Sequence, residues 1–275
     1  MSYANYQSRA LPDFVRYIAD LMRYRHLCWN LVGSDLRARF RRSKLGILWA
    51  VIQPLGYSLI IAWAWGVIFK VSNYWAFATY VYSGMLVWDF FSNTVMGGLD
   101  GLIGATGYLR QARIPLLVFQ TRVPLSGGVN FLFGMIGLGV MMTALQLWSA
   151  PGPHLLLVPA SLLFLLLFLL PLTIVLSILG TQFRDLKHIM GLALQALFFL
   201  SPVMIQREFL NSKELAVLKY VNPLVPLIDL FRAPLLQGDY WRTDAIITIC
   251  IWISVMWTLA IILSTNIGRR VVFSL

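Results

Sequence analysis

The feature that most constrains this chain is a long stretch without charge, since residues 123–183 contain no Asp, Glu, Lys or Arg. A helix crosses the hydrocarbon core of a bilayer in about 20 residues, so the stretch is too long for one span. Pro151, Gly152 and Pro153 interrupt it, and these residue types end one helix and begin the next. The sequence therefore predicts two membrane spans joined by a tight turn.

The rest of the chain is apolar enough to continue this pattern, because 59% of its 275 residues are hydrophobic and only 12% are charged. A soluble protein of this composition could not cover its core, so lipid has to be part of the solvent. We predict an all-α integral membrane protein with six transmembrane helices. The predicted spans cover approximately residues 45–69, 74–98, 123–148, 155–180, 189–205 and 243–267.

Two segments outside the spans have a recognisable character. Residues 206–242 contain Pro223, Pro226 and Pro234, and are too broken to cross the membrane. Near the N-terminus, apolar residues recur at helical spacing between Leu11 and Met22, which is typical of an amphipathic helix in the membrane interface. We divide the chain into an N-terminal interfacial region, one membrane domain and a short tail, at residues 1–44, 45–268 and 269–275.

The basic residues indicate an orientation. With the N-terminus inside, most of the 22 Lys and Arg residues fall in cytoplasmic segments, so both termini are predicted to be cytoplasmic. Basic residues beside spans face anionic headgroups, which explains the net charge of +11 without any nucleic acid as partner. A dense group of them, the basic collar, directly precedes the first span. The basic collar consists of Arg37, Arg39, Arg41, Arg42 and Lys44.

The sequence carries few groups that could perform chemistry. It has no Gly-x-x-x-x-Gly-Lys-Ser/Thr loop, so the chain is not expected to hydrolyse ATP by itself. The three histidines share no helix face at metal-ligand spacing. Asp89 is the acidic residue well inside a predicted span, where it either pairs with a neighbouring helix or lies near a wet cavity. We therefore predict no catalytic residue, metal or cofactor, and no proton-coupled carrier, which would need a relay of such groups.

Two further groups of residues allow more than one interpretation. Aromatic residues around the turn between the first two predicted spans form an interfacial belt or line a channel. These residues include Trp63, Trp65, Phe69, Tyr74 and Trp75. A short basic segment after the second span is either a solvated loop or a helix that docks onto a soluble partner. Its candidate residues are Tyr108, Leu109, Arg110, Gln111, Arg113 and Pro115.

The start of the first predicted span carries the most specific pattern in the chain. Residues 40–54 read Phe-Arg-Arg-Ser-Lys-Leu-Gly-Ile-Leu-Trp-Ala-Val-Ile-Gln-Pro. This segment resembles the corresponding segment of type-2 ABC exporter permeases that move polysaccharides, meaning O-antigen, capsule and teichoic acid exporters. Weaker similarities follow in the same order, at residues 109–115, at residues 183–186, and at Asn222-Pro223-Leu224 with Asp229 and Arg232.

The resemblance implies a homodimer that encloses a channel above two copies of a separate ABC ATPase subunit, which would hold ATP and Mg²⁺. Residues 109–115 would form the coupling helix to that subunit, with Tyr108 directly before it and Arg184 and Asp185 at the same cytoplasmic face. Residues 206–242 would form a pair of short re-entrant helices at the channel exit. The re-entrant turn would include Asn222, Pro223 and Arg232.

The cargo implied by the resemblance is a lipid-linked polysaccharide, exported across a bacterial inner membrane. The basic collar would then attract the phosphates of the lipid anchor, while anchoring to the membrane surface explains the same charges without a ligand. The alternatives are an ABC exporter of a lipid or drug, a membrane-embedded transferase and a passive channel. The transferase would need catalytic carboxylates or histidines in or near the membrane, and the residues found there argue against it.

Overall fold

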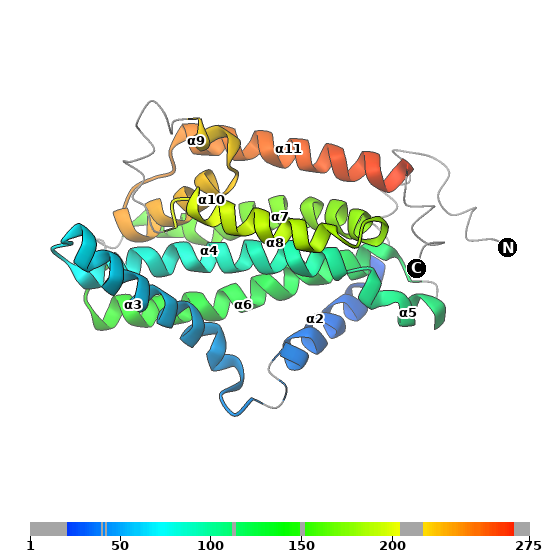
Figure 1. Ribbon diagram of the computed structural model, residues 1–275, viewed down its shortest axis with the longest axis horizontal. Coiled ribbons are helices and arrows are strands. Elements are labelled where there is room, and N and C mark those ends of the chain that lie inside the picture. The colour runs from blue at the N-terminus through cyan, green and yellow to red at the C-terminus, as the bar shows by residue number, and fades with distance from the viewer. Residues whose placement is uncertain are drawn as a thin grey trace.

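The computed structural model describes residues 21–39, 41, 43–111, 114–148, 152–203 and 217–266. Within these ranges the chain consists of helices and turns and contains no strand, which confirms the predicted all-α class for this part of the molecule. Five helices have between 21 and 29 residues, and the first of them is inclined to the others (Figure 1). They are α3 (Trp49–Phe69), α4 (Tyr74–Asp100), α6 (Leu116–Ala144), α7 (Leu157–Gln182) and α11 (Thr243–Asn266).

The bundle has two ends, which we name after the short helices beside them (Figure 1). At the α5 end, α4 leads through η3 (Ile103–Ala105) into α5 (Thr106–Gln111), and α7 turns into α8 (Leu186–Phe199). At the α10 end lie the turn between α3 and α4, the short helix η4 (Pro153–Leu156), and α10 (Leu224–Arg232). The two predicted spans of the charge-free stretch correspond to α6 and α7.

Among the described residues, four helices are long and apolar enough to cross a membrane. They cover Gly46–Ile68, Leu116–Ala144, Pro153–Gln182 and Thr243–Thr265. Helix α4 has the length of a span, with 27 residues, but is less apolar. Helix α8 is apolar but has only 14 residues. The chain is therefore a multi-pass membrane protein.

The core of the bundle is built around α4, which packs against α3, α6 and α7. More than half of its residues are buried, including Tyr82, Phe90 and Phe91. The Tyr82 hydroxyl donates a hydrogen bond to the Gly134 carbonyl of α6 over 3.2 Å. Because neighbouring helices cover it, α4 accommodates polar and aromatic side chains that would be unfavourable against lipid.

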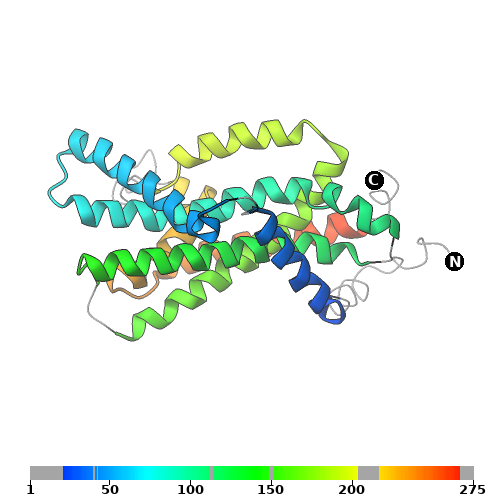
Figure 2. The same ribbon diagram turned by 90° about the horizontal axis from the view of Figure 1, so that it is seen from below.

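Helix α2 (Arg25–Arg39) precedes the first candidate span and packs against α6, burying Cys28, Leu31 and Val32. Figures 1 and 2 show α2 and α3 diverging from the segment that joins them, so the two helices form a V beside the bundle. The predicted interfacial helix between Leu11 and Met22 lies almost entirely outside the described residues.

The chain between α8 and α11 does not form a span in the part that the structure describes, residues 217–242. It forms α9 (Leu218–Val221), α10 and the π-helix η6 (Ala233–Gln237). Helix α10 is buried along nearly its whole length, and packs against α4, α7 and α11. The broken sequence pattern therefore corresponds to short helices inserted between longer ones.

Candidate functional site

The pattern at the start of the first span forms the turn that leads into α3. Gly46 has a φ of +53°, a left-handed conformation that favours glycine. The Ser43 hydroxyl accepts hydrogen bonds from the Gly46 backbone N–H over 3.3 Å and from Trp49 Nε1 over 3.1 Å. The Ser, Gly and Trp of the pattern thus have one structural role, since together they close this turn and set the direction of α3.

The basic collar lies next to this turn, at the apex of the V. Arg37, Arg39, Arg41 and Lys44 are exposed, and Arg42 lies outside the described residues. Arg39 Nη2 donates to Asn93 Oδ1 on α4 over 3.0 Å, and Asn93 Nδ2 donates to the Asp89 backbone carbonyl over 2.6 Å. The collar therefore contacts α4 through Arg39, and its other described cations remain open to a ligand.

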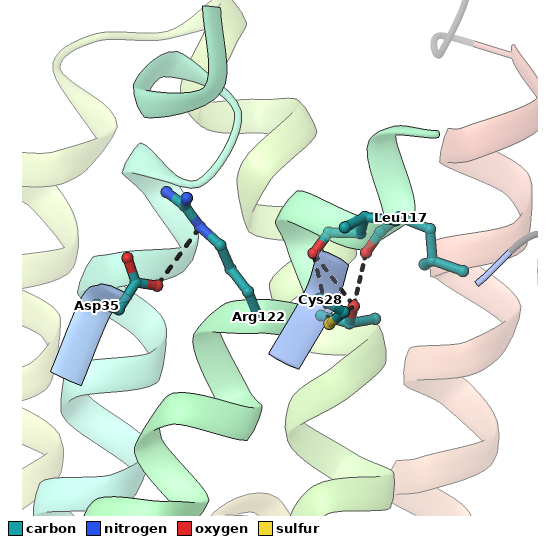
Figure 3. Close-up of polar contacts among 6 residues, drawn as sticks. Cys28, Asp35, Leu117 and Arg122 are labelled. Carbon is teal, nitrogen blue, oxygen red and sulfur yellow. Dashed lines mark hydrogen bonds and ion pairs between the residues drawn. The ribbon is translucent and has the colours of Figure 1, made fainter. Parts of the chain in front are cut away.

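A seam of polar contacts joins α2 to α6, as Figure 3 shows. Asp35 Oδ2 and Arg122 Nε point toward each other and are 3.5 Å apart. Cys28 Sγ lies 3.7 Å from Thr121 Oγ1. Burial raises the pKa of Asp35, and Arg122 partly opposes this, while burial likewise raises the pKa of the Cys28 thiol. The seam fixes α2 on the bundle, and the thiol remains in its weakly reactive protonated form.

The candidate coupling residues lie at the α5 end. Tyr108 is exposed on α5, with its ring 5.8 Å from that of Phe119, while Leu109 packs against the apolar core of this end. Pro115 precedes α6 and acts as its N-cap residue. Gln111 is exposed, Arg113 lies outside the described residues, and the side chain of Arg110 is not described.

A cavity of about 320 Å³ opens beside these residues, between the ends of α4, α7 and α8. Its lining includes Asp100, Ile103, Thr106, Thr181, Arg184 and Lys187. Lys187 Nζ donates to Asp100 Oδ2 over 2.6 Å, and both side chains are about half exposed. Arg184 and Asp185 are exposed in the turn before α8. Sequence analysis selected Arg184 and Asp185 but missed the ion pair, whose partners are far apart in the sequence.

The α10 end contains a buried cluster around Arg232, whose side chain is 3% exposed. Its guanidinium donates to Ser83 Oγ over 2.9 Å, to the carbonyls of Tyr80 and Val203 over 2.7 and 2.9 Å, and to the Pro202 carbonyl. It also lies over the Tyr80 ring, 3.6 Å from the centroid. One cation thus joins α10 to α4 and to the chain that follows α8.

Asn222 lies just before α10, at the opposite end of that helix from Arg232, and extends this cluster of hydrogen bonds. Its side-chain amide donates to the Leu200 carbonyl over 3.2 Å and to Ser201 Oγ over 2.9 Å, and its Oδ1 accepts from the Leu224 backbone N–H. Pro223 is the N-cap residue of α10. The chain becomes buried directly after α8, at Ser201 and Val203, so the carbonyls there need donors, and Asn222 and Arg232 supply them.

The aromatic residues at the α3–α4 turn fall into two groups. Trp63 and Trp75 are exposed, whereas Trp65 and Tyr74 pack against the core. The Tyr74 hydroxyl donates to the Leu59 carbonyl over 2.9 Å. The side chain of Phe69 is not described. Two of the candidate channel residues therefore have a packing role, and Trp63 and Trp75 keep an open surface.

The molecule has apolar spans, a charged cavity at the α5 end and short buried helices at the α10 end. These features define its class, the multi-pass transport subunit. The chain belongs to the ABC-2 type transporter family, whose pattern it matches over residues 26–236. The family implies an ABC ATPase as partner, and the chain itself is the transport subunit rather than a catalytic one.

Curated relatives are similar over most of their length. The chain is 33% identical over 224 residues to the O-antigen export system permease protein RfbA of Myxococcus xanthus, covering 80% of this chain and 84% of the relative. It is 24% identical over 223 residues to a protein of that name from Klebsiella pneumoniae, covering 76% and 82%. The polysialic acid transport protein KpsM of Escherichia coli is 22% identical over 208 residues, covering 74% and 79%.

Proposed function

We propose that this chain is the channel-forming permease subunit of an ABC transporter that exports a lipid-linked polysaccharide across the bacterial inner membrane. The observation that carries the proposal is the 33% identity over 80% of the chain to an O-antigen export permease. The Escherichia coli relative is named for polysialic acid transport, so polysaccharide is the cargo that the names of the relatives have in common. Neither name favours a drug or lipid exporter.

The proposed topology has six spans, with the α5 end and both termini in the cytoplasm. Helix α4 supplies the second span, because its burial within the bundle compensates for its lower apolarity. Helix α8 supplies most of the fifth span. Residues 206–242 form the re-entrant segment at the channel exit, where Asn222 and Arg232 satisfy backbone groups away from lipid.

The proposed complex has two copies of this chain and two ATPase subunits. Residues 108–115 form the coupling segment on the cytoplasmic face, with Arg184 and Asp185 beside it. ATP and Mg²⁺ are held by the ATPase subunits, whose hydrolysis drives transport. The exposed faces of α3 and α11 provide the surfaces for lipid and for the second copy.

The lipid anchor of the cargo is proposed to approach the basic collar. Arg37, Arg41 and Lys44 are exposed beside the V formed by α2 and α3, where they can bind phosphate oxygens. Trp63 and Trp75 are the aromatic residues whose open surfaces can stack on sugar faces in a channel.

The test compares surface polysaccharide in cells with and without this chain, and in cells carrying Arg110→Glu with Arg113→Glu. Deletion is expected to remove the surface polymer and to cause its lipid-linked form to accumulate inside. The double variant is expected to lose both export and co-purification of the ATPase. Unchanged surface polymer in the deletion would contradict polysaccharide export, and an intact complex in the double variant would contradict the coupling role of residues 108–115.

A further inference from the structure

Helix α8 has a polar attachment to the rest of the bundle at each of its two ends. Within the part of the chain that the structure describes, Leu194 is the one buried residue of this helix. At the α5 end, Lys187 in its first turn pairs with Asp100, the last residue of α4. At the α10 end, Asn222 and Arg232 bind the carbonyls at and beyond its last turn. These two polar attachments add to the apolar packing of Leu186, Met190, Leu197 and Phe198 on the core.

The two attachments differ in how easily a group from another molecule can replace one of their partners. Arg232 is buried and makes several charge-assisted hydrogen bonds, which stay strong where water is excluded. The Asp100 and Lys187 side chains are 51% and 49% exposed, so water and salt weaken their attraction. A charged group from another molecule can therefore replace Asp100 at Lys187, whereas the Arg232 cluster stays in place.

The cavity at the α5 end leaves room for such a group. It lies beside the ion pair, has a volume of about 320 Å³, and includes Arg184 in its lining. Arg184 makes no ion pair within the described residues, so the cavity has two cations and one carboxylate. Helices α7 and α4 approach each other closely at Gly180, where a Cβ atom would collide with the Leu99 carbonyl. This contact closes one side of the cavity. The cavity thus has a rigid wall and an excess of positive charge.

The donors that the cavity offers to a ligand come from its two cations, Arg184 and Lys187, which can bind a carboxylate. The hydroxyls of Thr106 and Thr181 donate to carbonyls of their own turns, over 2.6 and 2.7 Å, so they offer only acceptors to a ligand. The rim also has exposed apolar side chains, Ile103 and Phe183, at 45% and 61% exposure. Exposed apolar side chains beside charged ones are typical of a surface that another protein covers.

We propose that this cavity receives an acidic side chain of the ATPase partner, which competes with Asp100 for Lys187 and so releases the α5 end of α8. The proposal rests on the proposed function, since it places the ATPase at the α5 end beside residues 108–115. Docking of the ATPase then loosens one attachment of α8 while the Arg232 cluster acts as the pivot. In this way, docking of the ATPase changes how firmly α8 is held, and α8 ends close to the proposed channel exit.

The first test measures the dissociation constant of the ATPase from the purified permease in nanodiscs, for Lys187→Gln and Asp100→Asn. Lys187→Gln should weaken binding roughly three- to tenfold, because one ligand of the carboxylate is lost. Asp100→Asn should strengthen binding by a similar factor, because the competitor is gone. If the ion pair only supported the fold, both variants would lose the same contact and shift binding in the same direction, which would overturn the proposal.

The matched control breaks another exposed ion pair at a distance from the cavity. Arg242 Nε lies 3.2 Å from Asp244 Oδ1 at the start of α11, at the end of the bundle remote from α5 (Figure 1). Arg242→Gln should leave ATPase binding unchanged. A change as large as that in Lys187→Gln would mean that any lost surface charge weakens the complex, and would overturn the specific role of the cavity.

The second test places benzoylphenylalanine at position 183, on the cavity rim, in the full chain expressed with the ATPase. Illumination is expected to give a covalent adduct with the ATPase subunit. Adducts only with lipid, only with a second copy of the chain, or no adduct at all would overturn the proposal. The same cells report surface polysaccharide, so an ATPase adduct without dependence of the polymer on this chain would retain the cavity assignment and reject polysaccharide export.

Discussion

The α10 end and the α5 end of the molecule are both joined by charged residues, yet these residues are used differently. At the α10 end Arg232 is buried and binds backbone carbonyls from two segments. At the α5 end Asp100 and Lys187 are half exposed and bind each other. A buried cation with several hydrogen-bond partners produces a permanent joint, whereas an exposed ion pair produces one that a partner can open. The comparison indicates which end moves.

The largest effect is expected when the joint at the α10 end is broken. Arg232→Met removes the donors for the Tyr80, Pro202 and Val203 carbonyls in a buried site, and should lower the free energy of unfolding by about 3–5 kcal/mol. Denaturant unfolding in detergent measures this change. The exposed Arg242→Met is the control and should cost less than about 0.5 kcal/mol. Equal stability of the two variants would contradict a permanent joint.

The second largest loss of stability is expected when a side chain fills the space beside the Arg232 guanidinium. A Cβ at Gly84 would collide with the guanidinium of Arg232 and would lie 2.9 Å from the Val203 carbonyl. Gly84→Ala should therefore destabilise the protein by about 1–3 kcal/mol. Gly139 in α6 has no neighbouring atom near its Cβ position, so Gly139→Ala should be neutral or stabilising. The comparison fails if thermal unfolding shows the same shift for both variants.

A smaller effect is expected at the seam between α2 and α6, and it should depend on pH. Burial raises the pKa of Asp35 in the folded state, so the folded protein binds a proton more readily than the unfolded chain. The stabilising contribution is present at low pH and is lost as the pH rises through the raised pKa. Asp35→Asn should abolish this pH dependence, with a change at pH 7 within about 1 kcal/mol. Unfolding curves at several pH values measure it, and an unchanged slope in the variant would contradict the assignment.

The smallest effect on stability is expected at the α5 end. Asp100→Asn breaks an ion pair whose partners are half exposed, and should change the free energy of unfolding by no more than about 0.5 kcal/mol. The same variant is expected to alter ATPase binding, so stability and coupling separate at this end. A loss of stability comparable to that of Arg232→Met would remove the contrast between the two ends.

Local sequence patterns predicted the elements that depend on neighbouring residues. The prolines and glycine at positions 151–153 lie between α6 and α7, and the charge-free residues on both sides form these helices. Arg122 lies directly before the charge-free stretch, where the third predicted span starts. Helix α6 begins earlier, at Leu116, because Arg122 is tolerated inside the helix through its pairing with Asp35.

The sites depended on contacts that no local pattern contains. Arg232 was selected from the family resemblance, but its partners Tyr80 and Ser83 lie about 150 positions earlier in the chain. Asp100 and Lys187 are likewise brought together only by the packing of α4 and α8. Helix α2 contains the basic collar, and its docking on α6 through Cys28 and Asp35 required the structure.

We propose that this chain exports a lipid-linked polysaccharide with a partner ATPase, and transport in vesicles tests this most directly. The vesicles contain the purified permease and ATPase, with a radiolabelled lipid-linked polysaccharide supplied on the side of the α5 end. The polymer should become protected inside the vesicles only when ATP is hydrolysed, and Arg232→Met should abolish this protection. Protection without ATP, or none with the intact complex and ATP, would contradict ATP-driven export by this chain.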